Sequence, residues 1–114
     1  MAKLQSQKYR TCIDACNETV EASELCALKC LHEENVKSLT KCIELCATCS
    51  HICSFASMAM SAESEYSKKI CDLCAEICEA CATECEKMGT NMDMCKQCAD
   101  ACRRCAQECR NMMR

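Results

Sequence analysis

The sequence has no proline and a single glycine, Gly89, in 114 residues. Because these two residues most often end helices and form tight turns, long uninterrupted helices are possible along most of the chain. A chain of this length fits one folded unit, so we expect a single domain over residues 1–114.

Aromatic residues and basic clusters are also scarce. The chain has three aromatic residues, no tryptophan and a net charge of −3, with lysines and arginines alternating with acids. A nucleic-acid groove needs a basic face with stacking rings, and no uninterrupted apolar run approaches the ~18 residues of a membrane span. The N-terminal MAKLQSQKYR lacks the apolar stretch of a secretory signal. We therefore expect a cytoplasmic protein that binds neither nucleic acid nor membrane.

Large apolar side chains are too few for an ordinary core. Leucine, isoleucine, valine and phenylalanine supply 15 of the 114 residues, which is below the ~20% under which a chain begins to look disordered. The helical periodicity is nevertheless too regular for disorder. The core must therefore consist of cysteine, alanine and methionine.

What the chain has in abundance is cysteine at helical spacing. In CDLCAEICEACATEC (Cys71–Cys85), the steps between cysteines are three, four, three and four residues. With 3.6 residues per turn, this alternation keeps every sulfur on one stripe of one helix. We take all eighteen cysteines as candidate metal ligands: Cys12, Cys16, Cys26, Cys30, Cys42, Cys46, Cys49, Cys53, Cys71, Cys74, Cys78, Cys81, Cys85, Cys95, Cys98, Cys102, Cys105 and Cys109.

The first stripe has a gap in its sulfurs but not in its period. Between Cys16 and Cys26 the same steps fall on Thr19 and Ser23, so we expect one helix over about Leu4 to His32. Helix-capping residues precede the later helices: Asn35 or Ser38, Ser61 or Ser64, and Thr90 or Asn91.

The remaining boundaries complete four helices. The second helix is expected to end near Met60, the third before Gly89 in a left-handed conformation, and the fourth to span about Met92 to Met112. Four such helices joined by short turns pack antiparallel to their neighbours. We predict an all-α fold, an antiparallel up-down-up-down four-helix bundle with a cysteine-lined core.

A second set of apolar residues lies beside the stripe: Ile13, Val20, Ile43, Ile52, Ile70, Leu73 and Ile77. These residues either widen the buried face of each helix or form a contact between bundles.

The cysteine spacing suits metal binding. Residues at i and i+4 have Cβ atoms ~5–6 Å apart, and an ion bonded at ~2.3 Å to each of two thiolates needs sulfurs at most about 4.6 Å apart. Eight pairs meet this condition: Cys12/Cys16, Cys26/Cys30, Cys42/Cys46, Cys49/Cys53, Cys74/Cys78, Cys81/Cys85, Cys98/Cys102 and Cys105/Cys109.

Softness and charge select the ion. Thiolates favour Cu(I), zinc or iron–sulfur clusters. Zinc usually takes four ligands presented by turns, and the bacterial ferredoxin run requires a spacing and a proline that this chain lacks. One monovalent ion per thiolate neutralises a buried sulfur core, so we predict about one Cu(I) per cysteine. Zinc storage and an iron–sulfur electron carrier remain the alternatives.

Other interpretations of the cysteines fit less well. A disulfide framework belongs to secreted, loop-rich chains, and a redox enzyme needs an exposed thiol of low pKa rather than a buried array. Simple core packing explains one cysteine but not eighteen in register. No catalytic triad, phosphate loop or pair of catalytic carboxylates stands out, so we predict no enzymatic activity.

Methionines extend the stripes beyond the last cysteines, at Met60, Met88, Met92 and Met112. They either bind Cu(I) weakly at a mouth or plug the ends of the bundle as flexible apolar residues. His32 lies near one such end, and His51 is expected to face solvent.

The cysteine-rich four-helix layout, with CDLCAEICEACATEC and CKQCADACRRCAQEC as its most specific stretches, resembles the cytosolic branch of the bacterial copper storage proteins. The resemblance implies a homotetramer, storage of many Cu(I) ions along the core, and metal entry through one end. It also implies a metal-binding role for all eighteen cysteines, with a lower capacity where Thr19 and Ser23 replace sulfur. The copper donor and acceptor are not indicated.

Overall fold

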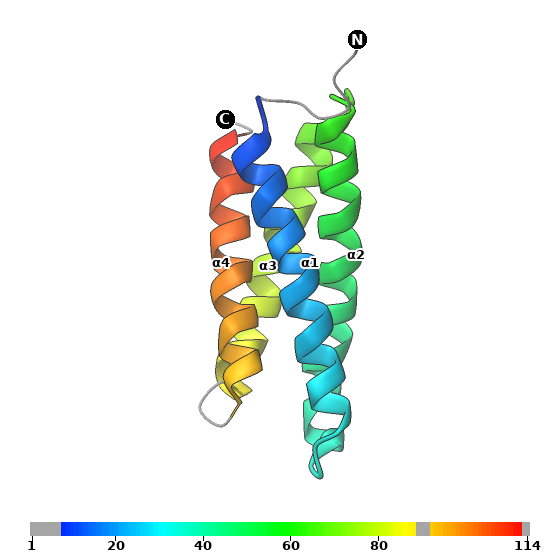
Figure 1. Cartoon of the computed structure of the whole chain (residues 1–114), viewed down its shortest axis with the longest axis vertical. Helices are drawn as coiled ribbons and strands as arrows, with labels where there is room; N and C mark the ends of the chain where they lie inside the picture. Colours follow the sequence, from blue (N-terminus) through cyan, green and yellow to red (C-terminus); the bar gives the residue numbers. More distant parts are fainter. Residues whose placement is uncertain (1–7, 89–91, 113–114) are drawn as a thin grey trace.

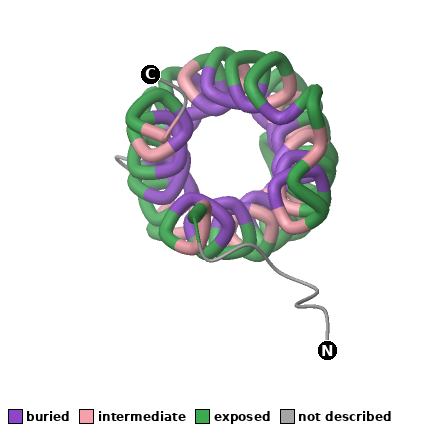
Figure 2. Tube along the Cα trace, turned by 90° about the horizontal axis from the view of Figure 1, so that it is seen from above, coloured by how far each residue is buried: buried purple, intermediate pink, exposed green. Residues whose placement is uncertain are grey.

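The computed structural model describes residues 8–88 and 92–112, which form four long helices and one short one (Figure 1). The elements are α1 (Arg10–Leu31), η1 (Val36–Leu39), α2 (Thr40–Ser61), α3 (Ser67–Met88) and α4 (Asp93–Met112). α1 and α3 each pack against both α2 and α4, and successive helices run in opposite directions. The predicted up-down-up-down bundle is confirmed. Seen along its axis, it forms a ring whose buried faces point inward (Figure 2).

The expected bounds of α1 are wrong at its start. The helix begins at Arg10 because Lys8 and Tyr9 form a turn, and residues 1–7 lie outside the described part of the chain. At the other end, α1 stops at Leu31, and the backbone N–H of His32 donates to the carbonyl of Lys29.

The capping residue predicted for α2 is also wrong. Asn35 and Ser38 bond each other: the Asn35 amide donates to the Ser38 hydroxyl at 3.1 Å, and that hydroxyl donates to the Asn35 carbonyl at 2.8 Å. This local network stabilises the single turn η1. α2 begins only afterwards, at Thr40, with no side-chain cap from Leu39.

The α2–α3 turn ends α2 without glycine. Ser61 is the last residue of α2 rather than the cap of α3. The Ser64 hydroxyl accepts a hydrogen bond from the N–H of Tyr66, the residue just before α3 starts at Ser67. Glu63 adopts a φ of 53°, in the left-handed region that costs a residue with a Cβ about 1–2 kcal/mol. The predicted caps Gly89, Thr90 and Asn91 lie outside the described residues.

Charge is unevenly distributed over the outside of the bundle. α3 and α4 are joined by ion pairs from Arg103 to Glu86, at 2.7 Å, and from Arg110 to Glu79. The Arg110 guanidinium keeps the pKa of the Glu79 carboxyl below its usual value. α2, in contrast, carries only two charged side chains, Lys41 and Glu44, apart from His51.

The outer face of α2 is correspondingly apolar. Phe55 and Met58 are 49% and 63% exposed, and they border a groove of about 630 Å³ between α2 and α3. By length and composition alone, Val36–Ser61 is apolar enough to cross a membrane, although core helices pass the same test and 39% of the 18-residue window is buried. The cysteines that raise its hydropathy face the core.

The second set of apolar residues includes both buried and exposed members, and its part in a contact between bundles stays a prediction. Ile13 is fully buried and widens the core. Leu73 is 47% exposed, and it lines the α2–α3 groove together with the half-buried Ile52 and Ile70.

Candidate metal-binding site

The core of the bundle is a column of sulfur. All eighteen cysteines are free and fully buried, and they come from all four long helices. The prediction that each stripe faces one shared axis is therefore confirmed, because the buried residues, which include all the cysteines, lie on the inward faces of the four long helices (Figure 2).

Sulfurs on the same helix lie close enough to share an ion. The Sγ–Sγ distance is 3.9 Å for Cys49/Cys53 and Cys74/Cys78. An ion at ~2.3 Å from each sulfur fits between atoms that are up to about 4.6 Å apart. The i, i+4 spacing therefore gives usable pairs without any movement of the backbone.

The shortest sulfur contacts join different helices. Cys26 and Cys95 are 3.4 Å apart, and Cys12 and Cys109 are 3.5 Å apart, in both cases between α1 and α4. The sequence spacing does not indicate which sulfurs meet across the axis, because that depends on the rotation and register of each helix.

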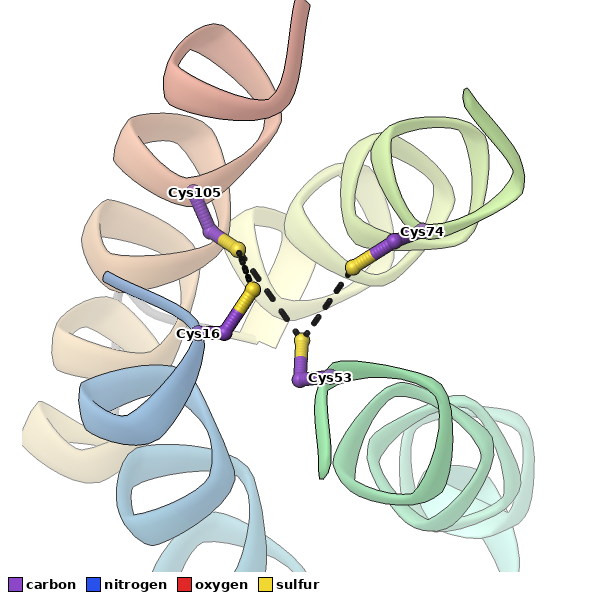
Figure 3. A group of neighbouring side chains, drawn as sticks. All are labelled: Cys16, Cys53, Cys74 and Cys105. Atoms are coloured by element: carbon purple, nitrogen blue, oxygen red, sulfur yellow. Dashed lines mark hydrogen bonds between the residues drawn. The ribbon is translucent and has the colours of Figure 1, made fainter. Parts of the chain in front are cut away.

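One group contains a sulfur from every helix: Cys16, Cys53, Cys74 and Cys105 (Figure 3). Cys16 lies 3.6 Å from Cys105, and Cys53 lies 3.6 Å from Cys74 and 4.0 Å from Cys105. All four sulfurs are within 4.8 Å of one another and point toward a common centre. An ion at this position could be coordinated by any of several pairs or triads of these sulfurs.

Further groups share members with their neighbours, so the sulfurs form a chain of overlapping sites. These groups are Cys12/Cys16/Cys109, Cys26/Cys42/Cys46/Cys85, Cys26/Cys30/Cys42/Cys95 and Cys46/Cys81/Cys85/Cys98. Because sulfurs are shared, the column suits many ions bridged by common ligands better than a few separate four-ligand cages.

Burial and hydrogen bonds from neighbouring thiols shift the pKa values of the cysteines in opposite directions. Desolvation raises the pKa of Cys30 to about 12 and also raises the pKa of Cys95, because a thiolate is poorly stabilised away from water. Deeper in the column, hydrogen bonds from thiols, Cys102 first, lower the pKa of Cys81 because an S–H donor stabilises a neighbouring thiolate.

The column contains no cationic side chain that would balance many thiolates. In residues 8–88 and 92–112 no lysine, arginine or histidine is buried. Without metal, most of the sulfurs are therefore neutral thiols that pack as small apolar groups. A soft cation is the component that would allow them to ionise together.

The methionines lie at the ends of the column. Met60 is fully buried, and the partly buried Met88, Met92 and Met112 pack against the core. The Sγ of Cys95 donates to the Sδ of Met92 at 4.0 Å, so this thioether is in contact with the sulfur row. The burial of Met60 is consistent with a residue that closes the end of the bundle. Met92 is placed either to close the other end or to bind Cu(I) weakly through its sulfur.

The two histidines lie outside the core. His32 is exposed. His51 is also exposed, as predicted, with Nδ1 at 2.7 Å from the Ala47 carbonyl oxygen.

Sequence reasoning missed one position of the stripe. Ala56 is fully buried and falls between Cys53 and Met60 on the inward face of α2. The same three- or four-residue step that located the cysteines would have found it. One end of the column therefore has an alanine and a methionine on α2 where sulfurs would otherwise continue.

The sequence pattern of one protein family, described as copper storage protein (Csp), matches residues 5–114. A relative from Bacillus subtilis strain 168, the uncharacterized cysteine-rich protein YhjQ, is 45% identical over 65 residues. That match covers 57% of this chain and 60% of the relative, less than two thirds of its length.

Two solved structures resemble the bundle along most of its length. The Cu(I)-bound copper storage protein BsCsp3 of Bacillus subtilis has 44% identity and a TM-score of 0.89, with 95% of this chain and 100% of that chain covered. A cytosolic copper storage protein from Streptomyces lividans, described with five coppers, has 32% identity and a TM-score of 0.90, with 94% and 92% covered.

Proposed function

The chain belongs to the copper storage protein family, and from this premise we propose that it stores many Cu(I) ions in the cytoplasm, bound by the thiolates of all eighteen cysteines. The observation that carries the proposal is the continuous column of buried sulfurs from four helices, with neighbouring Sγ atoms 3.4–4.0 Å apart. Copper here is cargo for copper homeostasis rather than a resident cofactor.

The chemistry of loading follows from the neutral core. Each Cu(I) binds two or three sulfurs and displaces protons from thiols, so one positive charge enters for about each thiolate formed. The loaded column stays close to electroneutral, which avoids the several kcal/mol that each uncompensated buried charge would cost. Storage needs no substrate turnover, and we propose that the single domain of residues 1–114 is not an enzyme.

Charge also separates copper from zinc. A Zn(II) ion held by four thiolates leaves two negative charges in the core. If no ligands are shared, each such ion also occupies four sulfurs. Eighteen sulfurs would satisfy at most four such ions. An iron–sulfur electron carrier would hold few metals and would absorb visible light, so metal number and colour distinguish all three cargoes.

The test is an anaerobic titration of the reduced protein with Cu(I) in the presence of a competing chelator, followed by metal analysis. We expect saturation near one copper per cysteine, about eighteen, without visible colour. Parallel titrations with Zn(II) and Fe(II) provide the comparison. Preference for zinc or iron would favour those cargoes over copper, and saturation after one to four Cu(I) ions without such a preference would indicate that the column is mainly a packing core.

We further propose that the protein assembles as a homo-oligomer, a tetramer by its family resemblance, through the apolar face of α2. Phe55 and Met58 are exposed on a helix with few charges, beside the α2–α3 groove. The seam between α3 and α4 is instead bridged by ion pairs such as Arg103–Glu86. A second copy of this apolar face would remove both surfaces from water.

Lysine at two positions of this face is expected to dissociate the oligomer. In the F55K/M58K variant, light scattering coupled to size exclusion should give the monomer mass of 12.7 kDa, because each subunit would bring two lysine charges into the buried interface. The control R103K/E86D retains charge at the α3–α4 seam and should assemble normally. An unchanged mass for F55K/M58K, or a monomeric unmodified protein, would argue against this interface.

A further inference from the structure

Three sets of three sulfurs in the column form closed triangles, in which every edge measures between 3.5 and 3.9 Å. Each triangle joins an i, i+4 pair on one helix to a single sulfur on the helix that packs against it. The triangles are Cys46/Cys81/Cys85, Cys53/Cys74/Cys78 and Cys49/Cys53/Cys78. All of these cysteines belong to α2 or α3, so this side of the column presents groups of three mutually adjacent thiols.

The most regular triangle consists of Cys46, Cys81 and Cys85. Cys46 lies 3.8 Å from each of the other two sulfurs, which are 3.9 Å apart. An atom bonded at ~2.3 Å to three thiolates in one plane holds their sulfurs about 4.0 Å apart, and shorter edges place the atom above that plane. This triangle therefore fits a central atom at the apex of a shallow pyramid.

The other two triangles share the edge between Cys53 and Cys78, which is 3.5 Å long. The third corner is either Cys74, 3.6 Å from Cys53 (Figure 3), or Cys49, 3.6 Å from Cys78. These shorter edges give a steeper pyramid. Because a shared edge serves one central atom at a time, the three triangles offer two separate sites.

Net charge determines which element suits an isolated triangle of thiolates. Three thiolates around Cu(I) carry a net charge of −2, and three around a divalent ion carry −1, whereas a trivalent centre with three thiolates is neutral. In residues 8–88 and 92–112 no lysine, arginine or histidine is buried beside the sulfurs, so excess negative charge would be uncompensated there. Copper approaches neutrality only when ions share sulfurs, but a trivalent centre needs no sharing.

Trivalent arsenic and antimony combine this charge with the required shape, because their lone pair occupies a fourth direction and leaves three bonds in a pyramid. We propose that the two sites bind a trivalent metalloid, As(III) or Sb(III), taken up as its uncharged hydroxide. In each site As(OH)3 exchanges three As–O bonds for three As–S bonds. Each thiol proton leaves with a hydroxide as water, so three waters are released and no oxidation state changes. The proposal goes beyond copper storage and does not rest on it.

The test is native mass spectrometry of the reduced, metal-free protein titrated with sodium arsenite. We expect two tightly bound arsenic atoms, each of which adds the mass of arsenic less three hydrogens. X-ray absorption at the arsenic edge should show three sulfur neighbours and no oxygen neighbour.

One double variant opens all three triangles. C46A/C53A removes a corner from each, and arsenic binding at both sites should weaken about a hundredfold, because the third As–S bond forms within an already tethered complex. The matched control C12A/C26A removes two equally buried sulfurs of α1 that belong to none of the three triangles, and it should retain both sites. Circular dichroism checks each fold. If the double variant does not fold, the single variants C46A and C53A should each lose one site.

The outcomes separate this inference from copper storage. Lack of arsenic uptake by the unmodified protein, or arsenic that keeps oxygen ligands, contradicts the proposal. Equal losses in C46A/C53A and C12A/C26A contradict the assignment to the triangles. A protein that fills with Cu(I) but leaves arsenite unbound retains only the storage function, and one that binds two arsenic atoms but few copper ions retains only the present inference.

Discussion

Copper-loaded protein is expected to unfold at a much higher guanidinium concentration than the metal-free protein. Anything that binds only the folded state stabilises it, and at a free Cu(I) concentration 100 times Kd one site contributes about 2.7 kcal/mol. Three such sites already exceed the lower end of the 5–15 kcal/mol that is roughly typical of a whole domain. The effect should be large because many groups, including Cys16/Cys53/Cys74/Cys105, join different helices.

The measurement is far-UV circular dichroism during anaerobic guanidinium titration, with and without Cu(I). Addition of a strong Cu(I) chelator to the loaded sample should return the midpoint to that of the metal-free protein. Equal midpoints for the two forms would mean that copper binds outside the column or binds the unfolded chain equally well.

Copper loading is also expected to release about one proton per ion, which makes affinity steeply dependent on pH. Burial raises the pKa of Cys30 to about 12 and raises that of Cys95, so these thiols are protonated at pH 7 and must lose their protons to bind metal. When one proton is exchanged per ion, the affinity for each Cu(I) falls about tenfold for each unit by which pH is lowered.

Both the release of protons and the direction of the pH dependence can be measured directly. In weakly buffered anaerobic solution, addition of Cu(I) should acidify the sample, and titration with base to constant pH counts the protons. Repeating the chelator competition at pH 6, 7 and 8 should show tighter binding at higher pH. Far fewer protons than coppers would mean that most sulfurs are thiolates before metal arrives.

The alternation of three- and four-residue steps was sufficient to predict which residues face the axis. It predicted the burial of Cys71 as well as that of Thr19, because a helical period locates a face whatever side chain occupies it. The antiparallel bundle followed from four such faces and short connections.

Contacts between helices could not be predicted in this way. The 3.4 Å approach of Cys26 to Cys95 depends on how far α1 and α4 are rotated and shifted against each other, which no local pattern specifies. The predicted helix ends near His32, Met60 and Met112 lie within one residue of those observed, whereas the starts of the first three helices were predicted poorly. Asn35 and Ser38 have capping side chains, but they bond each other in η1, and Glu63 adopts the left-handed conformation expected of glycine.

The order of the helices affects how long the newly made chain stays unfolded. In the unfolded chain all eighteen thiols are exposed together to oxidants and to stray metals. Each helix packs against the next one in sequence, across connections as short as the turn between Ser61 and Ser67, and such local contacts favour rapid folding. Fast collapse of the helices shortens the period in which exposed thiols can form wrong disulfides. The simple topology therefore helps to keep the cysteines reduced, as well as arranging them around the axis.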